Sequence, residues 1–389
     1  MDSTQKGIIT LLKSAVTQQC LPIAEDFDLE AAAALMKRHH CNTLLYDGAV
    51  RCGISRDLPV MQKLFRSYCK MMQISVGQMQ MLEQVLSAFE ANGIDYMLLK
   101  GSKLKTMYPQ PELRIMGDAD VLIRIEQRKA IKKVMETLGF TNTGDSDHEY
   151  VWQNQQLYLE LHKRLIPSYN RDFYEYFGDG WQFARQQEGC RHAMSPEDEL
   201  VFLFTHFAKH YRDGGIGCRH VVDLFVCLRS YPELNEEYVR QQLDKLHLLT
   251  FYGHICRLLQ VWFEDEPGDE VTEYITQFVF SSGSWGAAET NVLAFAFRDP
   301  QEKANVWKSR VTWLRAVAFP NVASLRGKYP VLRKAPWMLP AVWVVRPFVK
   351  LLWGRKDLEK RRKQLNALNW ENLEKRKKAL KYVGLDYHF

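Results

Sequence analysis

The sequence predicts an α+β protein in which a small mixed β-sheet lies between N-terminal helices and a C-terminal helical domain. Apolar residues recur every three or four positions from about 3 to 92, which is the helical period. They alternate or form short blocks in the next hundred residues, as strands do, and the helical period returns after Ser195. We therefore expect four regions: N-terminal helices (1–92), an α/β core (93–190), a helical domain (191–300) and a basic amphipathic tail (301–389).

The composition is that of a large globular chain in a reducing compartment. The 389 residues are 46% hydrophobic and 25% charged, which is enough for a substantial core and two or three domains. The eight cysteines form no CxxC pair, which argues against a thiolate metal site or a disulfide scaffold. Neither a signal peptide nor an apolar run long enough to span a membrane is apparent, so we expect a cytoplasmic location.

The α/β core is expected to begin after a long helix that ends at the C-cap pair Asn92-Gly93. Prolines at 109 and 111 then break the chain, and Gly139 ends a later helix. The expected elements are a strand at 95–99, a Gly-Ser turn at 101–102, one or two helical turns at 103–108, a strand at 118–123, a helix at 126–138, and strands at 148–153 and 157–162 joined by a hairpin turn at Asn154-Gln155.

The helical domain opens with a strong start signal. In the run Ser-Pro-Glu-Asp at 195–198, serine caps the helix, proline occupies the first turn and the acids complement the helix dipole. The periodicity then predicts helices at about 196–211, 217–230, 235–246, 248–263 and 268–280.

Three acids of the α/β core form the first candidate site. Asp118 and Asp120 are two residues apart on an expected strand, so they share one face of it. In LYLELHK, Glu160 and His162 share the face opposite the leucines. If the two strands are neighbours, Glu160 joins the aspartates and His162 lies at their edge. Such a carboxylate cluster suits Mg²⁺, with Mn²⁺ as the alternative, and predicts a metal site for phosphate chemistry.

Residues before the second strand offer a phosphate site. The Gly101-Ser102 turn leaves backbone N–H groups open to phosphate oxygens. Lys100 and Arg114 carry the positive charge that would neutralise a triphosphate.

A second constellation has three interpretations and consists of His206, Lys209, His210, Arg219, His220 and Asp223. The first is a zinc site, because His206 and His210 share a helix face, but it lacks a third ligand and the HExxH pattern. The second is an interhelical polar cluster in which Asp223 orients Arg219 or a histidine. The third is a set of cations that lines the cleft and binds a triphosphate or an acceptor.

The tail is strongly basic. Residues 301–389 hold 21 Lys or Arg and 6 Asp or Glu, a net charge of +15, so the preceding 300 residues carry −9. Three prolines (336, 340 and 347) with Arg346 and Lys350 interrupt its apolar stretch, so it is no simple membrane span. Trp337, Trp343 and Trp353 beside basic residues suit a lipid headgroup interface. The alternative is a helix packed on the helical domain with a solvated basic face.

The segments LLKGSKLKTMYPQPELRIMGDADVLI, ETLGF and LELHKRL resemble an uncharacterised bacterial nucleotidyltransferase-like family of the DNA polymerase β-type nucleotidyltransferase superfamily. The resemblance extends to HFAKHYRDGGIGCRHVVDLFVCL and covers about residues 80 to 290. It implies a nucleotidyltransferase core in which Gly101-Ser102 anchors the nucleotide, Asp118 and Asp120 bind metal, and Glu160 helps to activate an acceptor hydroxyl. Two features depart from the superfamily: the spacer of fifteen residues before Asp118 is long, and glutamate replaces the usual aspartate at 160.

We therefore expect a Mg²⁺-dependent nucleotidyltransferase that moves an NMP group from an NTP to an acceptor hydroxyl and releases pyrophosphate. The expected nucleotide-binding residues are Lys100, Gly101, Ser102, Arg114, His162, Lys209 and Arg219. The alternative is a catalytically inactive nucleotide-binding or membrane-docked interaction protein of the same fold. Expected partners are the NTP, an unidentified acceptor and an anionic membrane surface at the inner membrane face. Nucleic acid is less favoured, because the basic residues lie mainly in the tail and RNA-binding signatures are absent.

Overall fold

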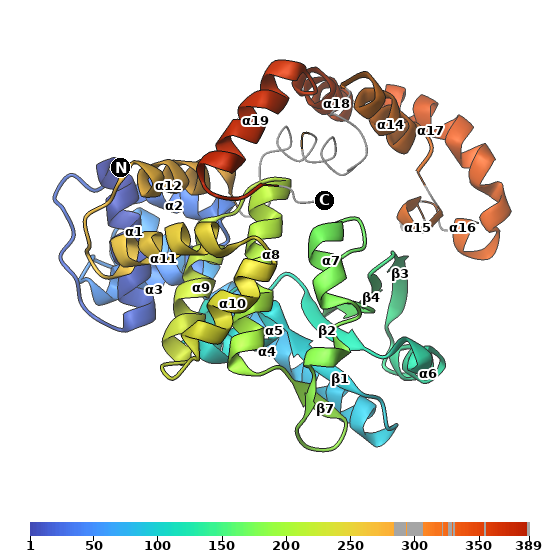
Figure 1. Ribbon diagram of the computed structural model, residues 1–389, viewed down its shortest axis with the longest axis horizontal. Coiled ribbons are helices and arrows are strands. Elements are labelled where there is room, and N and C mark those ends of the chain that lie inside the picture. The colour runs from blue at the N-terminus through green and yellow to red at the C-terminus, as the bar shows by residue number, and fades with distance from the viewer. Residues whose placement is uncertain are drawn as a thin grey trace.

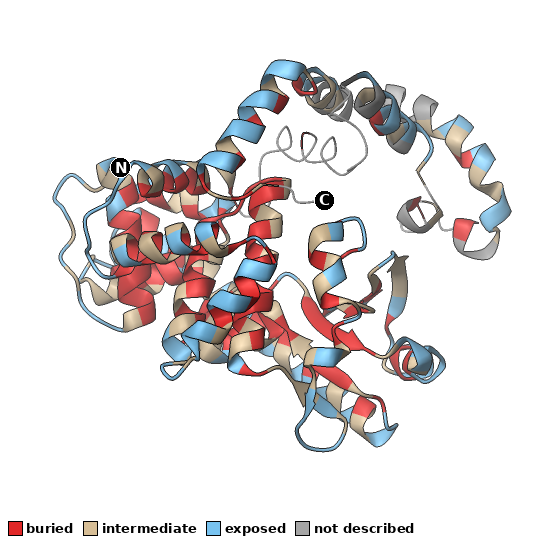
Figure 2. Cartoon of the chain, viewed as in Figure 1, coloured by how far each residue is buried: buried red, intermediate tan, exposed pale blue. Residues whose placement is uncertain are grey.

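Figure 1 shows the computed structural model, which describes residues 1–283, 293, 306–320, 322–325, 329, 331–353 and 355–386. It confirms the α+β fold class, with helices before and after a seven-stranded mixed sheet. Buried residues concentrate where the helices meet one another and the sheet (Figure 2).

Four N-terminal helices precede the sheet: α1 (Ser3–Thr17), α2 (Leu29–Arg38), α3 (Asn42–Arg51) and α4 (Pro59–Ala91). The Asp2 side chain caps α1 by accepting a hydrogen bond from the Gln5 N–H. Helix α1 crosses α3 so closely that a Cβ at Gly48 would lie 2.0 Å from the Leu11 carbonyl oxygen, which explains the glycine. Helix α4 ends at Ala91 with Asn92 as its C-cap, and Gly93 follows with φ +63°, so the predicted end of this helix is confirmed.

The sheet has the strand order β3-β4-β5-β2-β1-β7-β6. Its strands are β1 (Tyr96–Leu99), β2 (Ala119–Ile123), β3 (Thr141–Asp145), β4 (Glu149–Gln153), β5 (Tyr158–His162), β6 (Arg185–Gln186) and β7 (Arg191–Ala193). Strand β2 is antiparallel to β1 and parallel to β5, and β5 is antiparallel to β4. The strand at 95–99, the strand at 118–123 and the predicted hairpin are thus confirmed, with ends shifted by one residue.

One face of the sheet packs on a hydrophobic core. Side chains of α4 and of α6 (Arg128–Thr137) meet odd-numbered residues of two central strands there, including Val121 of β2 and Leu159 of β5. Because side chains alternate along a strand, the even-numbered residues Asp120 and Glu160 turn to the opposite face. Burying the leucines on one side therefore directs the acids toward the other.

Several elements differ from the prediction. Gly101 and Ser102 lie inside a short helix, α5 (Lys100–Leu104), instead of a turn. The edge strand β3, the short strands β6 and β7 and helix α7 (Arg171–Phe177) were not anticipated. The sequence of β3, TNTGD, has no apolar alternation because this edge strand is only partly buried. Single 3-10 turns occupy Lys105–Met107, Pro111–Leu113, Ile125–Gln127, Trp181–Phe183 and Pro336–Met338.

The helical domain contains α8 (Pro196–Asp213), α9 (Cys218–Ser230), α10 (Glu236–Lys245), α11 (Leu249–Phe263) and α12 (Glu270–Ser282). All five predicted helices are confirmed, with ends that differ by at most two residues. The Ser195 side chain accepts a hydrogen bond from the Asp198 N–H, so the predicted cap is also confirmed.

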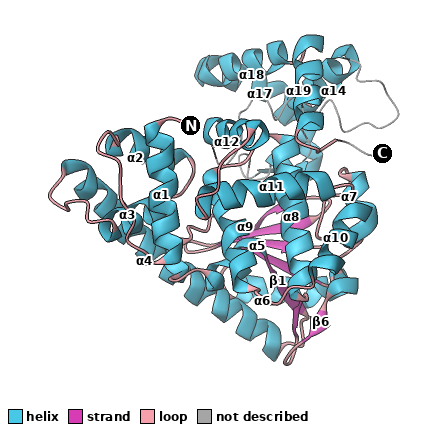
Figure 3. Cartoon of the chain, turned by 60° about the vertical axis from the view of Figure 1, so that its left-hand side comes forward, coloured by secondary structure: helices cyan, strands magenta, loops and turns pink. Residues whose placement is uncertain are grey.

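The tail forms α14 (Val306–Ala318), α15 (Val322–Leu325), α16 (Val331–Lys334), α17 (Leu339–Trp353), α18 (Arg355–Ala367) and α19 (Trp370–Tyr382). Its last part packs on the helical domain: Leu380, Val383 and Leu385 belong to the main hydrophobic core. Figures 1 and 3 both show α14, α17 and α18 grouped apart from the sheet. Among the described residues, no helix is long and apolar enough to cross a membrane.

Candidate functional site

A cavity of about 410 Å³ lies between the polar face of the sheet and helices α5, α8 and α9. Its two sides differ in charge. The sheet side carries Asp118, Asp120, Glu149, Glu160 and His162, and the helical side carries His206, Lys209, His210, Arg219 and His220 together with the acids Asp213 and Asp223. We call these sets the sheet wall and the helical wall.

Strand register places the acids of the sheet wall. Asp120 of β2 pairs with Glu160 of β5 in the parallel ladder. Glu149 of β4 pairs with His162 of β5 in the antiparallel ladder. These residues lie on one face because residues two apart on a strand point the same way. The predicted juxtaposition of Asp120, Glu160 and His162 is therefore confirmed.

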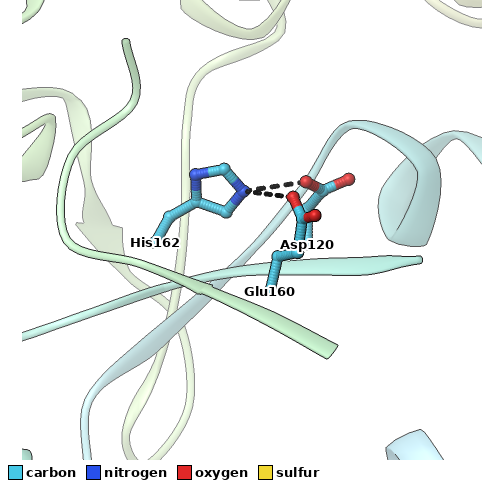
Figure 4. Close-up of side chains that lie close together, drawn as sticks. All are labelled: Asp120, Glu160 and His162. Atoms are coloured by element: carbon cyan, nitrogen blue, oxygen red, sulfur yellow. Dashed lines mark hydrogen bonds and ion pairs between the residues drawn. The ribbon is translucent and has the colours of Figure 1, made fainter. Parts of the chain in front are cut away.

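Figure 4 shows the centre of the sheet wall. The His162 Nε2 atom lies 2.8 Å from Asp120 Oδ1 and 3.7 Å from Glu160 Oε2. One ligand atom from each of these three residues lies within 4.8 Å of the others, and this is the one such group in the described part of the chain. Asp118, expected as a ligand beside Asp120, lies in the bend before β2; it lines the cavity but is not a member of that group.

Lys100 supplies the positive charge at this centre. Its Nζ atom donates a hydrogen bond to Asp120 Oδ1 at 3.0 Å and lies 3.5 Å from His162 Nε2. Burial alone would raise the pKa of Asp120, but the nearby Lys100 ammonium and the hydrogen bond to His162 hold that pKa well below its usual range. Asp120 is therefore ionised, and Lys100 occupies part of the space around it.

The other acids of the sheet wall carry more negative charge than Lys100 can balance. Burial and the charges of Glu149, Asp120 and Asp118 raise the pKa of Glu160 to about 8. Burial and the Asp120 charge also raise the pKa of Asp118. A divalent cation would relieve this repulsion, and carboxylate oxygens with one imidazole form a donor set that suits Mg²⁺ or Mn²⁺. The residues present therefore fit a divalent metal ion.

Arg114 has a role that the sequence did not reveal. Its Nε and Nη2 atoms donate hydrogen bonds to the two carboxylate oxygens of Asp223 on α9 at 2.7 and 2.9 Å. The Tyr108 hydroxyl donates to the same carboxylate at 2.7 Å. This buried, bidentate ion pair holds two of the guanidinium nitrogens of Arg114 on Asp223. Arg114 also lines the cavity, so its expected role as a phosphate ligand stays a prediction. It joins the loop before β2 to the helical domain.

Gly101 and Ser102 also differ from expectation. A Cβ at position 101 would lie 2.8 Å from Arg114 Nη1, so glycine is needed for the guanidinium to pack there. The Ser102 hydroxyl is buried and accepts a hydrogen bond from the Asp120 N–H at 2.9 Å. Gly101 lines the cavity, whereas Ser102 positions the start of β2.

The helical wall combines neutral histidines with two permanent cations. The Nε2 atoms of His206 and His210 are 3.0 Å apart, so one ring donates its N–H to the other. Burial and the Lys100 charge lower the pKa of His206 well below its usual value, and burial with the Lys209 charge does the same for His210. Burial and the Arg219 charge lower the pKa of His220 to about 3. Positive charge on this wall therefore comes from Lys209 and Arg219.

The structure bears on each of the three interpretations of this constellation. The second expected Asp223 to orient Arg219 or a histidine. Asp223 instead accepts hydrogen bonds from Arg114 and Tyr108, whereas Arg219 donates a hydrogen bond to the Ile115 carbonyl at 3.3 Å. His206, His210 and His220 are not a metal-ligand group within the described residues, which disfavours zinc. The histidines and the two cations all line the cavity, as the third interpretation expects, and binding of a triphosphate or an acceptor there stays a prediction.

The sequence analysis did not name two acids of the cavity, Glu149 and Asp213. The predicted hairpin held a signal for Glu149, because residues equally distant from a hairpin turn pair across the two strands. A two-residue turn at Asn154-Gln155 would place Glu149 opposite Glu160. In the structure the connection is two residues longer and Glu149 pairs with His162, and either register puts Glu149 on the polar face of the sheet.

Comparison with known families places this architecture in context. Residues 25–264 match the model of a family described as uncharacterised nucleotidyltransferase, and every residue of both walls lies inside the matched segment. Comparisons with curated proteins and with solved structures give no match. Because the match spans more than half of the chain, the protein belongs to this family of uncharacterised nucleotidyltransferases.

Proposed function

We propose that the protein is a metal-dependent nucleotidyltransferase that moves an NMP group from an NTP to an acceptor hydroxyl. The family match supports nucleotidyl transfer in general. The observation that carries the finer proposal is the opposition of the two walls across one cavity, acids on the sheet and Lys209 with Arg219 on the helices. Such a cavity can receive a metal ion on one side and a triphosphate on the other.

Each wall would have a distinct task. Asp120, Glu160 and His162, with Asp118 beside them, would hold Mg²⁺ or Mn²⁺, which when bound neutralises charge on the phosphates. Lys209 and Arg219 would bind the β- and γ-phosphates by charge. The Arg114 guanidinium fills the space beside Gly101, so a phosphate that approaches the start of α5 would meet its positive charge.

The transfer step requires a proton acceptor near the nucleophile. The acceptor oxygen forms a bond to the α-phosphorus, the bond from that phosphorus to the β-phosphate bridging oxygen breaks, and pyrophosphate leaves with the bonding electrons. The hydroxyl proton passes to the carboxylate of Glu160, which lies in the cavity beside Asp120 and His162. The positive charges of Lys209 and Arg219 stabilise the negative charge of the leaving pyrophosphate.

Nucleotide binding with and without metal tests the proposal. Purified protein with Mn²⁺ and a labelled NTP should show metal-dependent binding that Asp120→Asn and Glu160→Gln each weaken by about 100-fold. The matched control is Glu136→Gln, because Glu136 is an exposed glutamate on α6, across the sheet from the cavity. Equal binding by the wild type and both cavity variants would sink the proposal.

A second candidate is a nucleotide-binding protein without turnover. The observation that favours it is internal neutralisation: Asp120 is already paired with Lys100, and Arg114 with Asp223. Pyrophosphate release separates the two functions. Release that depends on metal and on an acceptor fraction from a cell lysate supports the transferase, whereas tight NTP binding without release under the same conditions supports the inactive module.

A further inference from the structure

Helix α14 presents an apolar stripe to solvent. Trp307, Val311, Leu314 and Ala318 are spaced by four, three and four residues, so they share one helix face, and all four are exposed. The Trp307 side chain is 73% exposed. The opposite face is the packed one, since Trp313 is buried there. This helix therefore turns an apolar face outward.

A second apolar stripe runs along α17 and the turn before it. Trp337, Ala341, Val344 and Val345 are exposed, at 79% for Trp337 and 65% for Val344. The other side of this helix holds the tail together: Trp343 Nε1 donates a hydrogen bond to the Pro320 carbonyl at 2.9 Å. Trp343, expected at a headgroup interface, is thus a packing residue, and the Trp353 side chain lies outside the described residues.

The charge of this part of the tail has one sign. Between Val306 and Trp353 the sequence holds nine Lys or Arg residues and no Asp or Glu. Arg315 is exposed next to Leu314 on α14. We call residues 306–353 the arm. It thus combines outward apolar stripes, two strongly exposed tryptophans and a charge that is entirely positive.

We propose that the arm docks on an anionic membrane surface, with its apolar stripes in the headgroup region and Arg315 against lipid phosphates. Helices that lie in a membrane interface combine an apolar face, basic residues and tryptophan in this way. Charge complementarity selects anionic lipid. Single-stranded RNA would also attract the positive charge, but it is bound by stacking on aromatic rings, and outward valines and leucines contribute little to that.

Docking is compatible with the rest of the molecule. Helix α19 follows the arm and is fixed to the helical domain: Arg376 donates a hydrogen bond to the Tyr211 carbonyl, and Leu380 is buried in the main core. Helices α14 and α17 of the arm stand apart from the sheet in Figures 1 and 3, and the short helix α15 contacts the edge strand β3. A bound arm would therefore hold the cavity near the membrane without covering it, and this inference does not depend on the proposed transfer reaction.

Vesicle flotation of the full chain tests the inference. The protein should float with vesicles that contain phosphatidylglycerol and remain behind with vesicles of phosphatidylcholine alone. The double variant Trp307→Ser/Trp337→Ser should lower partitioning to the anionic vesicles by about tenfold. The matched control Trp370→Ser changes a 55% exposed tryptophan on α19, outside the arm, and should float like the wild type. Point variants replace truncation because α19 belongs to the core.

Two further measurements test the role of positive charge in the arm and the competing partner, RNA. Arg315→Gln should lower partitioning by about fivefold, the loss expected for one basic residue near an anionic surface. A wild-type protein that fails to float with anionic vesicles, or a double variant that floats as well as the wild type, would overturn the inference. So would tight binding of labelled RNA that the tryptophan variants weaken while vesicle binding is absent. Unchanged thermal unfolding midpoints show that all variants fold.

Discussion

The two walls of the cavity face each other, but their ionisable groups are managed by different means. On the sheet wall, Asp120 and Glu160 are side by side because two strands pair in register, and their repulsion is only partly relieved by Lys100. On the helical wall, burial keeps His206 and His210 neutral, so positive charge is limited to Lys209 and Arg219, and the acids Asp213 and Asp223 lie on the same side.

The difference shows two ways of burying ionisable groups. Carboxylates on the sheet wall repel one another, whereas the histidines on the helical wall stay neutral. A metal ion would release the repulsion stored on the sheet wall, which gives that wall an affinity for cations. Neutral imidazoles on the helical wall leave Lys209 and Arg219 to attract an anion without a third and fourth positive charge close by. The cavity thereby separates a cation site from an anion site.

The connection between the walls should give the largest effect. Arg114→Met leaves Asp223 buried and uncompensated, so we expect unfolding free energy to fall by about 3–5 kcal/mol. The double variant Arg114→Met/Asp223→Leu removes both charges and should recover most of the loss. Urea unfolding of the three proteins measures both values. A double variant no more stable than the single one would show that the pair does not act as a unit.

The pH dependence of the sheet wall should follow Glu160. Its folded pKa is raised to about 8, above an unfolded value near 4.5, so the folded state binds the proton more tightly. The resulting stability is fully present below about pH 4.5 and is lost as pH rises through 8. Without divalent metal, wild type should therefore lose stability relative to Glu160→Gln between these values, by up to about 1.4 kcal/mol per pH unit. Urea unfolding at several pH values in EDTA measures the difference; a flat difference contradicts the prediction.

The helical wall should respond with the opposite sign. The folded pKa of His220 is lowered to about 3, so its unfolded state takes up a proton first, near pH 6.5. Stability from this residue is present above pH 6.5 and is lost as pH falls toward 3. We expect wild type to lose stability relative to His220→Gln on acidification from pH 6.5, again by up to about 1.4 kcal/mol per pH unit. If the unfolding free energy of the wild type instead rises relative to that of His220→Gln in this pH range, His220 is charged in the folded protein.

The walls also differ in how much the sequence could predict. Alternation along LYLELHK placed Glu160 and His162 on one face, and the hairpin rule would have added Glu149, because strand register is a local, two-residue pattern. The Arg114–Asp223 pair joins residues 109 positions apart, and no local pattern specifies such a contact. For the same reason, sequence identified the cations of α8 and α9 without showing which of them reach the cavity.

The smallest effect concerns competition for Asp120. Lys100 Nζ is 3.0 Å from Asp120 Oδ1, where it shares the oxygen that a metal ion would use. Lys100→Met removes this competitor, so we expect Mn²⁺ to bind about tenfold more tightly, a change of about 1.4 kcal/mol, as followed by the electron paramagnetic resonance signal of free Mn²⁺. The matched control is Lys163→Met, since Lys163 pairs with Asp145 at 2.7 Å and is not among the cavity residues. Weaker Mn²⁺ binding in Lys100→Met would instead mean that the Lys100 ammonium holds the Asp120 carboxylate in its metal-binding position. The sheet wall would then require Lys100 in order to bind a metal ion.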